Sequence, residues 1–185
     1  MEKLNRKDIL LLLLFAPGMS GDKAEAIKGR TRFTKLLFLL QELHGIDKAV
    51  KKYYSFEPYK LGPFTEELYN DLDVLETIGL VQVAVKEFVE ESETVEAERI
   101  PRDLLTYADA DAITAESYRE YEYKLSDSGR KLAHELYNSV PESIRQAVED
   151  VKTKFASLPL AELLRYIYRK FPEMGRKSIR TDLRG

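Results

Sequence analysis

The chain has no cysteine and only two histidines among its 185 residues. Without cysteine there are no disulfides, thiolate metal sites or cysteine nucleophiles. Two imidazoles, His44 and His134, exclude a histidine-rich metal site, and neither has an obvious nucleophile partner. Asp109 and Asp111 have no third ligand or glycine-rich loop beside them, so we interpret them as loop surface. We therefore expect no metal, no cofactor and no enzymatic activity.

Long apolar runs are also missing. The eight apolar residues Ile9–Ala16 are too few to span a bilayer, which takes about 20 residues. The basic residues before this run give it some likeness to a secretory signal. However, Asp8 adjoins the run, and Pro17-Gly18-Met19 offers no small-residue cleavage site. We expect instead the first core helix of a cytoplasmic protein that does not contact a membrane.

What the chain does have is a globular composition with strongly segregated charge. Hydrophobic residues make up 44% and charged residues 33%, which is typical of a folded domain. The formal net charge of −3 divides into +5 for residues 1–60, −13 for residues 61–123 and +5 for residues 124–185. Such segregation is informative about partners rather than about the fold.

Hydrophobic periodicity predicts the helices of the N-terminal half. A second helix should run from Arg30 to Gly45, which suits a left-handed stop; a helical turn is expected before it, around 23–27. After an extended aromatic segment, Tyr53–Tyr59, the pair Gly62-Pro63 is expected to interrupt regular secondary structure. Thr65 is a candidate N-cap for a third helix. This helix should end at Gly79, with an inward stripe of Leu68, Leu72, Leu75 and Ile78.

The C-terminal half predicts a hairpin followed by further helices. Leu80–Phe88 and Tyr121–Leu125 alternate like strands and enclose an acidic segment, 89–119, that is long for a hairpin loop. Ser126-Asp127-Ser128 should start a helix with Leu132 and Leu136 inward. Two more helices should follow Pro141 and Pro159, with inward residues Ile144, Val148, Val151 and Phe155, and Leu160, Leu163, Leu164, Ile167 and Phe171, respectively.

This order of elements predicts a mainly α fold with a small antiparallel β-hairpin: a winged helix-turn-helix with a C-terminal helical extension. The predicted winged-helix domain covers residues 1–138, the extension 139–172, and a mobile basic tail 173–185. The run Leu125-Ser126-x-x-Gly129-x-x-Leu132 resembles the exit from the wing in many winged-helix regulators.

A more specific resemblance covers about residues 30–82. Tyr59-Lys60-Leu61-Gly62-Pro63 forms an aromatic-x-x-Gly-Pro motif ahead of the pair Leu68-Tyr69, and Lys35–Leu39 supplies an earlier Lys-Leu-Leu helix. These features resemble Panacea-type antitoxin-like domains, although tryptophan is missing at the aromatic position and the acidic wing is long. The resemblance implies a winged-helix fold and a role as an antitoxin or as an adaptor that binds other proteins.

The charge of the third helix conflicts with DNA reading. Its outward face should hold Glu66, Asn70, Asp73 and Thr77. Asparagine and glutamate can read bases, but DNA affinity comes mainly from cations on phosphates. Any DNA contact should therefore come from basic residues elsewhere: Lys28, Arg30, Arg32, Lys35, Arg176, Lys177 and Arg180.

We interpret the chain as a non-catalytic winged-helix regulator. The alternative is a protein-only adaptor that binds a partner through its acidic third helix and wing. Self-association, in which basic ends meet the acidic middle of a second copy, is a further alternative.

Overall fold

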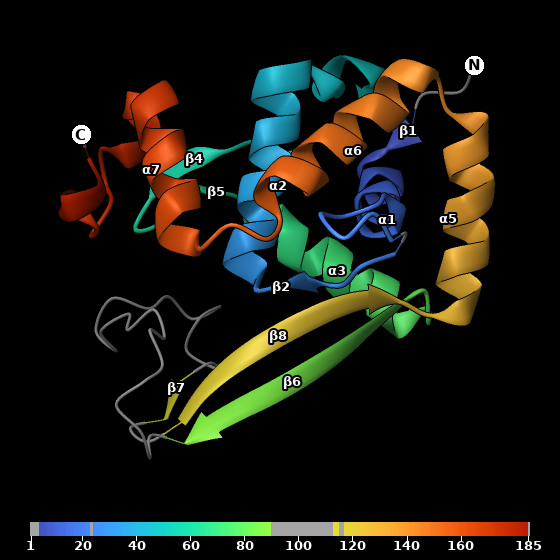
Figure 1. Ribbon diagram of the computed structural model, residues 1–185, viewed down its shortest axis with the longest axis horizontal. Coiled ribbons are helices and arrows are strands. Elements are labelled where there is room, and N and C mark those ends of the chain that lie inside the picture. The colour runs from blue at the N-terminus through green and yellow to red at the C-terminus, as the bar shows by residue number, and fades with distance from the viewer. Residues whose placement is uncertain (1–3, 23, 90–112, 115–116, 185) are drawn as a thin grey trace.

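The computed structural model of the chain describes residues 4–22, 24–89, 113–114 and 117–184. This part is mainly helical with small sheets (Figure 1). Helices α1 (Arg6–Phe15), α2 (Arg30–His44) and α6 (Glu142–Phe155) lie in the middle of the molecule. Helix α5 (Asp127–Ser139) lies at one end, and α7 (Leu160–Lys170) lies at the other with the C-terminus.

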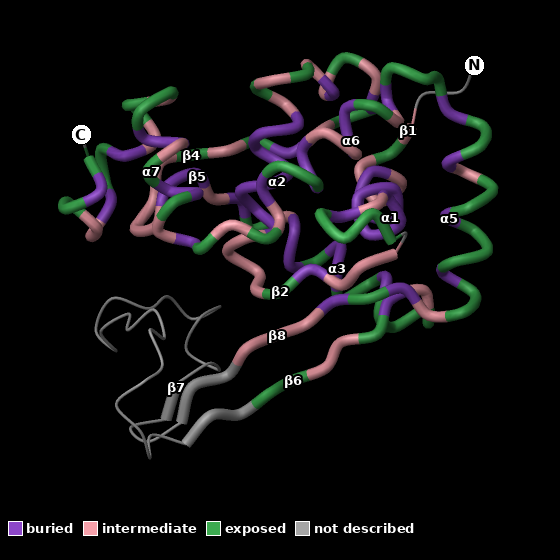
Figure 2. The backbone as a smooth tube through the Cα atoms, viewed as in Figure 1, coloured by how far each residue is buried: buried purple, intermediate pink, exposed green. Residues whose placement is uncertain are grey.

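Helix α1 is the centre of the core, as the apolar run predicts. All residues from Ile9 to Phe15 are buried (Figure 2). The helix begins at a capping box: the Asn5 side chain accepts hydrogen bonds from the backbone N–H groups of Lys7 and Asp8. Strand β1 (Leu4–Asn5) pairs in parallel with β3 (Val50–Lys51), which fixes the start of α1 beside the end of the short 3₁₀ helix Ile46–Ala49.

Helix α2 is confirmed, and Gly45 ends it with a φ of 60°. The helical turn expected around 23–27 is wrong for the described residues. Ile27–Lys28 form strand β2, which pairs antiparallel with β8 (Ser117–Leu125). A two-residue strand has no periodicity, so only its partner strand reveals it.

The Gly62-Pro63 pair does not interrupt secondary structure but belongs to a strand of a small hairpin. Strands β4 (Glu57–Tyr59) and β5 (Gly62–Phe64) pair antiparallel across Lys60 and Leu61. Gly62 has a φ of 85°, which favours glycine at the end of this turn. Proline is tolerated because a two-stranded sheet consists only of edges.

Helix α3 (Glu67–Thr77) confirms the third helix but begins later than expected. Its N-cap is Glu66, with no side-chain cap, so Thr65 does not have the predicted role. Leu68, Leu72 and Leu75 are buried as expected, whereas Ile78 is 58% exposed. Ile78 lies beyond the last helical residue, where Gly79, with a φ of 74°, turns the chain into strand β6 (Val81–Val89).

Strands β6 (Val81–Val89) and β8 form the long hairpin below the helices in Figure 1. Their register places Val81 opposite Leu125 and Val85 opposite Tyr121. The order in this sheet is β2-β8-β6, and β7 (Ile113–Thr114) also pairs with β8. The acidic wing predicted over 89–119 lies largely outside the described residues.

Helix α5 follows the hairpin and is capped by the Ser126 side chain, which accepts from the Gly129 N–H. A Cβ on Gly129 would lie 1.9 Å from the Leu80 carbonyl oxygen, so only glycine permits this close approach. The inward prediction for Leu132 is wrong: it is 41% exposed, and Leu136 is only half-buried. Ala133 and Tyr137 are buried instead, and the Tyr137 ring packs edge-on against Phe15 of α1.

Helices α6 and α7 bury the residues predicted for them, except that Phe171, just after α7, is half-buried. Helix α6 contributes to the same hydrophobic core as α1 and α2. The segment after Pro172 is not a mobile tail. It forms short 3₁₀ helices at Pro172–Gly175 and Thr181–Leu183, and it buries Ser178 and Leu183.

Candidate interaction site

The outer face of α3 is the most distinctive described surface. Glu66, Asn70, Asp73 and Thr77 are all exposed, as the sequence predicts. Two apolar side chains that we did not predict share this side of the molecule: Val74 is 43% exposed and Ile78 is 58% exposed. Their i, i+4 spacing was the available sequence signal. With the exposed Glu76, these residues form what we call the acidic face, defined as Glu66, Asn70, Asp73, Val74, Glu76, Thr77 and Ile78.

The remaining carboxylates of α3 have a structural role. Asp71 is only 3% exposed and lies 3.1 Å from the Lys7 ammonium, and it also pairs with Arg6. The Tyr54 hydroxyl donates to Asp71 at 3.0 Å, and burial raises the pKa of this tyrosine. Glu67 also pairs with Arg6. The inner acids of α3 are thus neutralised by the start of α1, while the acidic face points to solvent.

Arg30 connects α2, α3 and the hairpin. Its Nε donates to the Tyr123 hydroxyl at 2.5 Å, and its guanidinium lies 4.5 Å from the Tyr121 ring centre and 5.3 Å from that of Tyr69. Burial raises the pKa of Tyr123 to about 12, while Arg30 acts in the opposite direction. Arg30 therefore links the β6–β8 hairpin to α3, a role that sequence reasoning did not assign to it.

The other basic residues of α2 are also engaged within the fold. Arg32 donates from one Nη to the carbonyl oxygens of Ala156 and Leu158, at 2.6 and 2.7 Å. Lys35 is 2% exposed and donates to the Pro63 carbonyl oxygen at 3.0 Å. The prediction that Lys35 contacts phosphates is corrected by this burial. Lys28 is exposed on β2.

The C-terminal segment holds its basic residues in place through hydrogen bonds and an ion pair. Arg176 and Lys177 face solvent, whereas Arg180 pairs with Asp182 through two contacts of 2.9 Å. The buried Tyr168 hydroxyl donates to Ser178 Oγ at 2.7 Å. Arg184 donates to the carbonyl oxygens of Arg176 and Ser178, at 2.9 and 2.7 Å.

Helix α7 adds further exposed cations that sequence reasoning missed: Arg165, Arg169 and Lys170. The signal was the polar side of an amphipathic helix, with Arg165 and Arg169 spaced i, i+4. We call Arg165, Arg169, Lys170, Arg176 and Lys177 the C-terminal basic surface.

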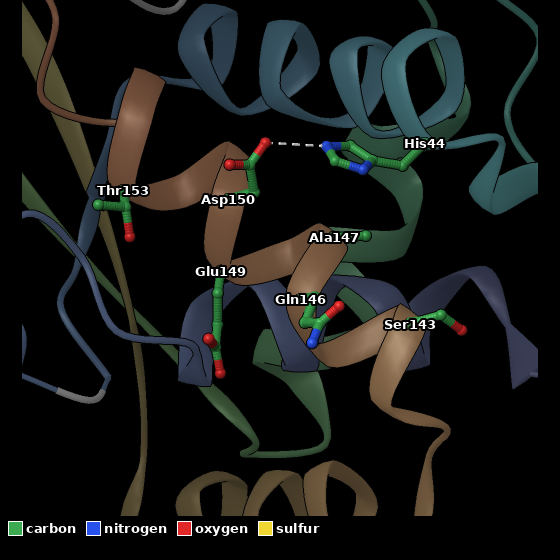
Figure 3. A pocket seen from close by; sticks show the side chains of 7 residues that line it. All are labelled: His44, Ser143, Gln146, Ala147, Glu149, Asp150 and Thr153. Atoms are coloured by element: carbon green, nitrogen blue, oxygen red, sulfur yellow. Dashed lines mark hydrogen bonds and ion pairs between the residues drawn. The ribbon is translucent and has the colours of Figure 1, made fainter.

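A polar groove of about 750 Å³ lies along α6 (Figure 3). His44 Nε2 lies 3.1 Å from Asp150 Oδ2 there, and hydrogen bonding from Lys154 lowers the pKa of Asp150. Ser143 also lines the groove, but its side chain points away from His44 in Figure 3. A histidine–carboxylate pair needs a nucleophile or substrate-binding groups within reach to catalyse acyl transfer. The groove does not place such groups beside the His44–Asp150 pair.

Within residues 4–22, 24–89, 113–114 and 117–184, no three His, Asp or Glu side chains gather as metal ligands would. Over the same residues, none of the helices has both the length and the apolar character that crossing a bilayer requires. Comparison of the chain with models of known protein families and with curated proteins found no match. We therefore infer the function from the surfaces of the chain itself.

Proposed function

We propose that the chain is a non-catalytic regulatory protein of the winged-helix kind that acts by binding another protein through the acidic face. The element order supports the winged-helix part of this proposal. Helices α1, α2 and α3 precede the β6–β8 hairpin, and the short strand β2 between α1 and α2 completes the sheet order β2-β8-β6. Arg30 holds the hairpin beside α3.

The observation that carries the protein-binding part is the mixed character of the acidic face. Val74 and Ile78 expose large apolar side chains at i, i+4 spacing. The same face exposes the carboxylates of Glu66, Asp73 and Glu76. Exposed apolar side chains next to polar ones are typical of protein interfaces. The carboxylates favour a partner that presents basic groups beside apolar ones.

The same face is poorly suited to DNA. Glu66, Asp73 and Glu76 would approach the phosphate backbone, whose charge dominates affinity. Two of the cations predicted to contact DNA, Arg32 and Lys35, are bound to backbone carbonyl oxygens of the fold.

The test is affinity capture with immobilised chain. Glu66→Lys plus Asp73→Lys should abolish retention of a partner that the unaltered chain captures, and the retained partner should elute as salt rises. Glu42→Lys plus Glu135→Lys is the matched control, because it changes the same charge at exposed sites on α2 and α5. Equal capture by the acidic-face variant and the unaltered chain would contradict the proposal.

DNA binding through the C-terminal segment is the second candidate function, favoured by the exposure of Arg176 and Lys177. Phosphate contacts predict an affinity that falls steeply with salt. Arg176→Glu plus Lys177→Glu is the appropriate variant, since changing Arg30 or Arg32 would disturb the fold. No shift of any duplex in a low-salt titration would exclude this candidate.

A further inference from the structure

Two surfaces of the described chain, the acidic face and the C-terminal basic surface, expose charges of opposite sign and lie on different elements. We propose that the acidic face of one copy binds the C-terminal basic surface of a second copy, so that the chain assembles head to tail. The proposal rests on the proposed function, because it names the partner of the same acidic face.

The basic partner surface is held in a fixed shape. Residues 160–184 carry a net charge of +4, from seven basic and three acidic residues. The Tyr168–Ser178 hydrogen bond and the two bonds from Arg184 fix the segment that presents Arg176 and Lys177. The Ile179 N–H also donates to the Lys60 carbonyl oxygen at 2.9 Å, which fastens the segment to the β4–β5 hairpin. A surface that is already ordered loses less conformational entropy on binding.

The acidic surface complements it in charge and in apolar content. Glu66 through Thr77 contains five carboxylates and no basic residue, and three of the carboxylates belong to the acidic face. Asp73 also lies near enough to Arg30 to interact with it electrostatically. The aliphatic stems of arginine and lysine can cover apolar side chains such as Val74 and Ile78 while their charges reach the carboxylates.

The two surfaces belong to different parts of one copy, so they remain available at the same time. Helix α7 and the C-terminus lie at one end of the molecule, whereas α3 lies in its middle, beside the hairpin (Figure 1). A contact between unlike surfaces is heterologous, and it continues beyond a dimer unless the copies close into a ring. Average mass should therefore keep rising with protein concentration.

Sedimentation of the full chain tests this assembly. The unaltered chain should associate in about 20 mM salt and dissociate in about 500 mM salt, where the Debye length falls from roughly 20 Å to roughly 4 Å. Glu66→Lys plus Asp73→Lys, and separately Arg176→Glu plus Lys177→Glu, should each weaken association by about 100-fold through like-charge contacts. The Glu42→Lys plus Glu135→Lys control should associate like the unaltered chain.

Mixing the two charge-reversed variants gives the decisive result. The reversed α3 of one variant should bind the reversed C-terminal surface of the other, and the two unaltered surfaces should pair as in the native contact. The mixture should therefore regain association beyond a dimer, although neither variant associates alone. A chain that stays monomeric in low salt, or variants that associate like the unaltered chain, would overturn the proposal. So would a tail variant that loses duplex binding but still self-associates. If the chain does not self-associate, the proposed protein-binding function is still tested separately, because affinity capture measures binding of other proteins.

Discussion

Two aspartates on the same helix have opposite environments. Asp71 is buried against Arg6, Lys7 and the Tyr54 hydroxyl, while Asp73 is exposed on the acidic face. Asp71→Ala should lower the free energy of unfolding by about 2 kcal/mol, because it leaves the buried Tyr54 hydroxyl and the partly buried Arg6 without this partner. Asp73→Ala should change it by less than about 0.5 kcal/mol. Urea unfolding of both variants checks this, and equal effects would contradict the separation of roles.

Lys152 lies on α6, and its buried side chain reaches the end of α1. Its ammonium donates to the carbonyl oxygens of Leu14, Ala16 and Glu25, at 2.8, 2.8 and 2.9 Å. Lys152→Met should lower the free energy of unfolding by about 1–3 kcal/mol, because these carbonyls lose their donor. Denaturant unfolding at pH 7 measures the loss.

The same lysine predicts a pH dependence. Burial lowers the pKa of Lys152 to about 7 from its ordinary value of 10.5, so between these values the unfolded chain binds more protons than the folded chain. The stability advantage of the unaltered chain over Lys152→Met should therefore grow from pH 7 towards pH 10.5, by at most about 1.4 kcal/mol per pH unit. A constant difference across this range would show that the amine does not titrate there.

At the scale of elements, the C-terminal segment depends on one buried hydroxyl. Tyr168→Phe removes the donor to Ser178 and should lower the free energy of local opening of this segment by about 1 kcal/mol. Local opening should then increase about fivefold, and tryptic cleavage after Arg176 and Lys177 should accelerate equally. Tyr166→Phe is the control, because this half-buried neighbour on α7 packs its ring against Phe155. Equal cleavage rates in the two variants would contradict the anchoring role.

Helices were the elements best predicted from the sequence, because a 3.6-residue period identifies a buried face without knowledge of its partner. The period failed at two leucine-stripe positions. Ile78 lies past the last turn of α3, and in the middle of α5 Leu132 is exposed while Gly129 and Ala133 are buried. Strand β2 was not predicted because it depends on pairing with β8, which comes much later in the chain. The β4–β5 hairpin was not predicted because strands of three residues are too short to show a period and the Gly62-Pro63 pair favours an interruption.

For the candidate site, the exposed polar residues of α3 were predictable from the helical face alone. The partners of the basic side chains were not predictable in this way. Arg32 and Lys35 donate to carbonyl oxygens that α6 and β5 bring to them from distant parts of the sequence. Basic side chains are usually solvated, so only the tertiary structure identifies those held inside.

At the scale of the whole molecule, the distribution of charge separates fold from function. Cations of α1 and α2 neutralise or bind groups within the fold, as Arg6 and Lys35 do. The acidic face and the C-terminal basic surface remain directed to solvent. The helix that the proposed winged-helix fold would place near DNA carries negative charge, which on our proposal favours a basic protein surface.

The most direct test of this central claim is site-specific cross-linking. A photoreactive amino acid in place of Asn70 reports what touches the middle of the acidic face in the cells from which the protein comes. The account predicts adducts with protein, either another chain or a second copy, and few adducts when the same group replaces Glu135 on α5. Adducts with nucleic acid at Asn70, or equal yields of protein adducts at both positions, would contradict it.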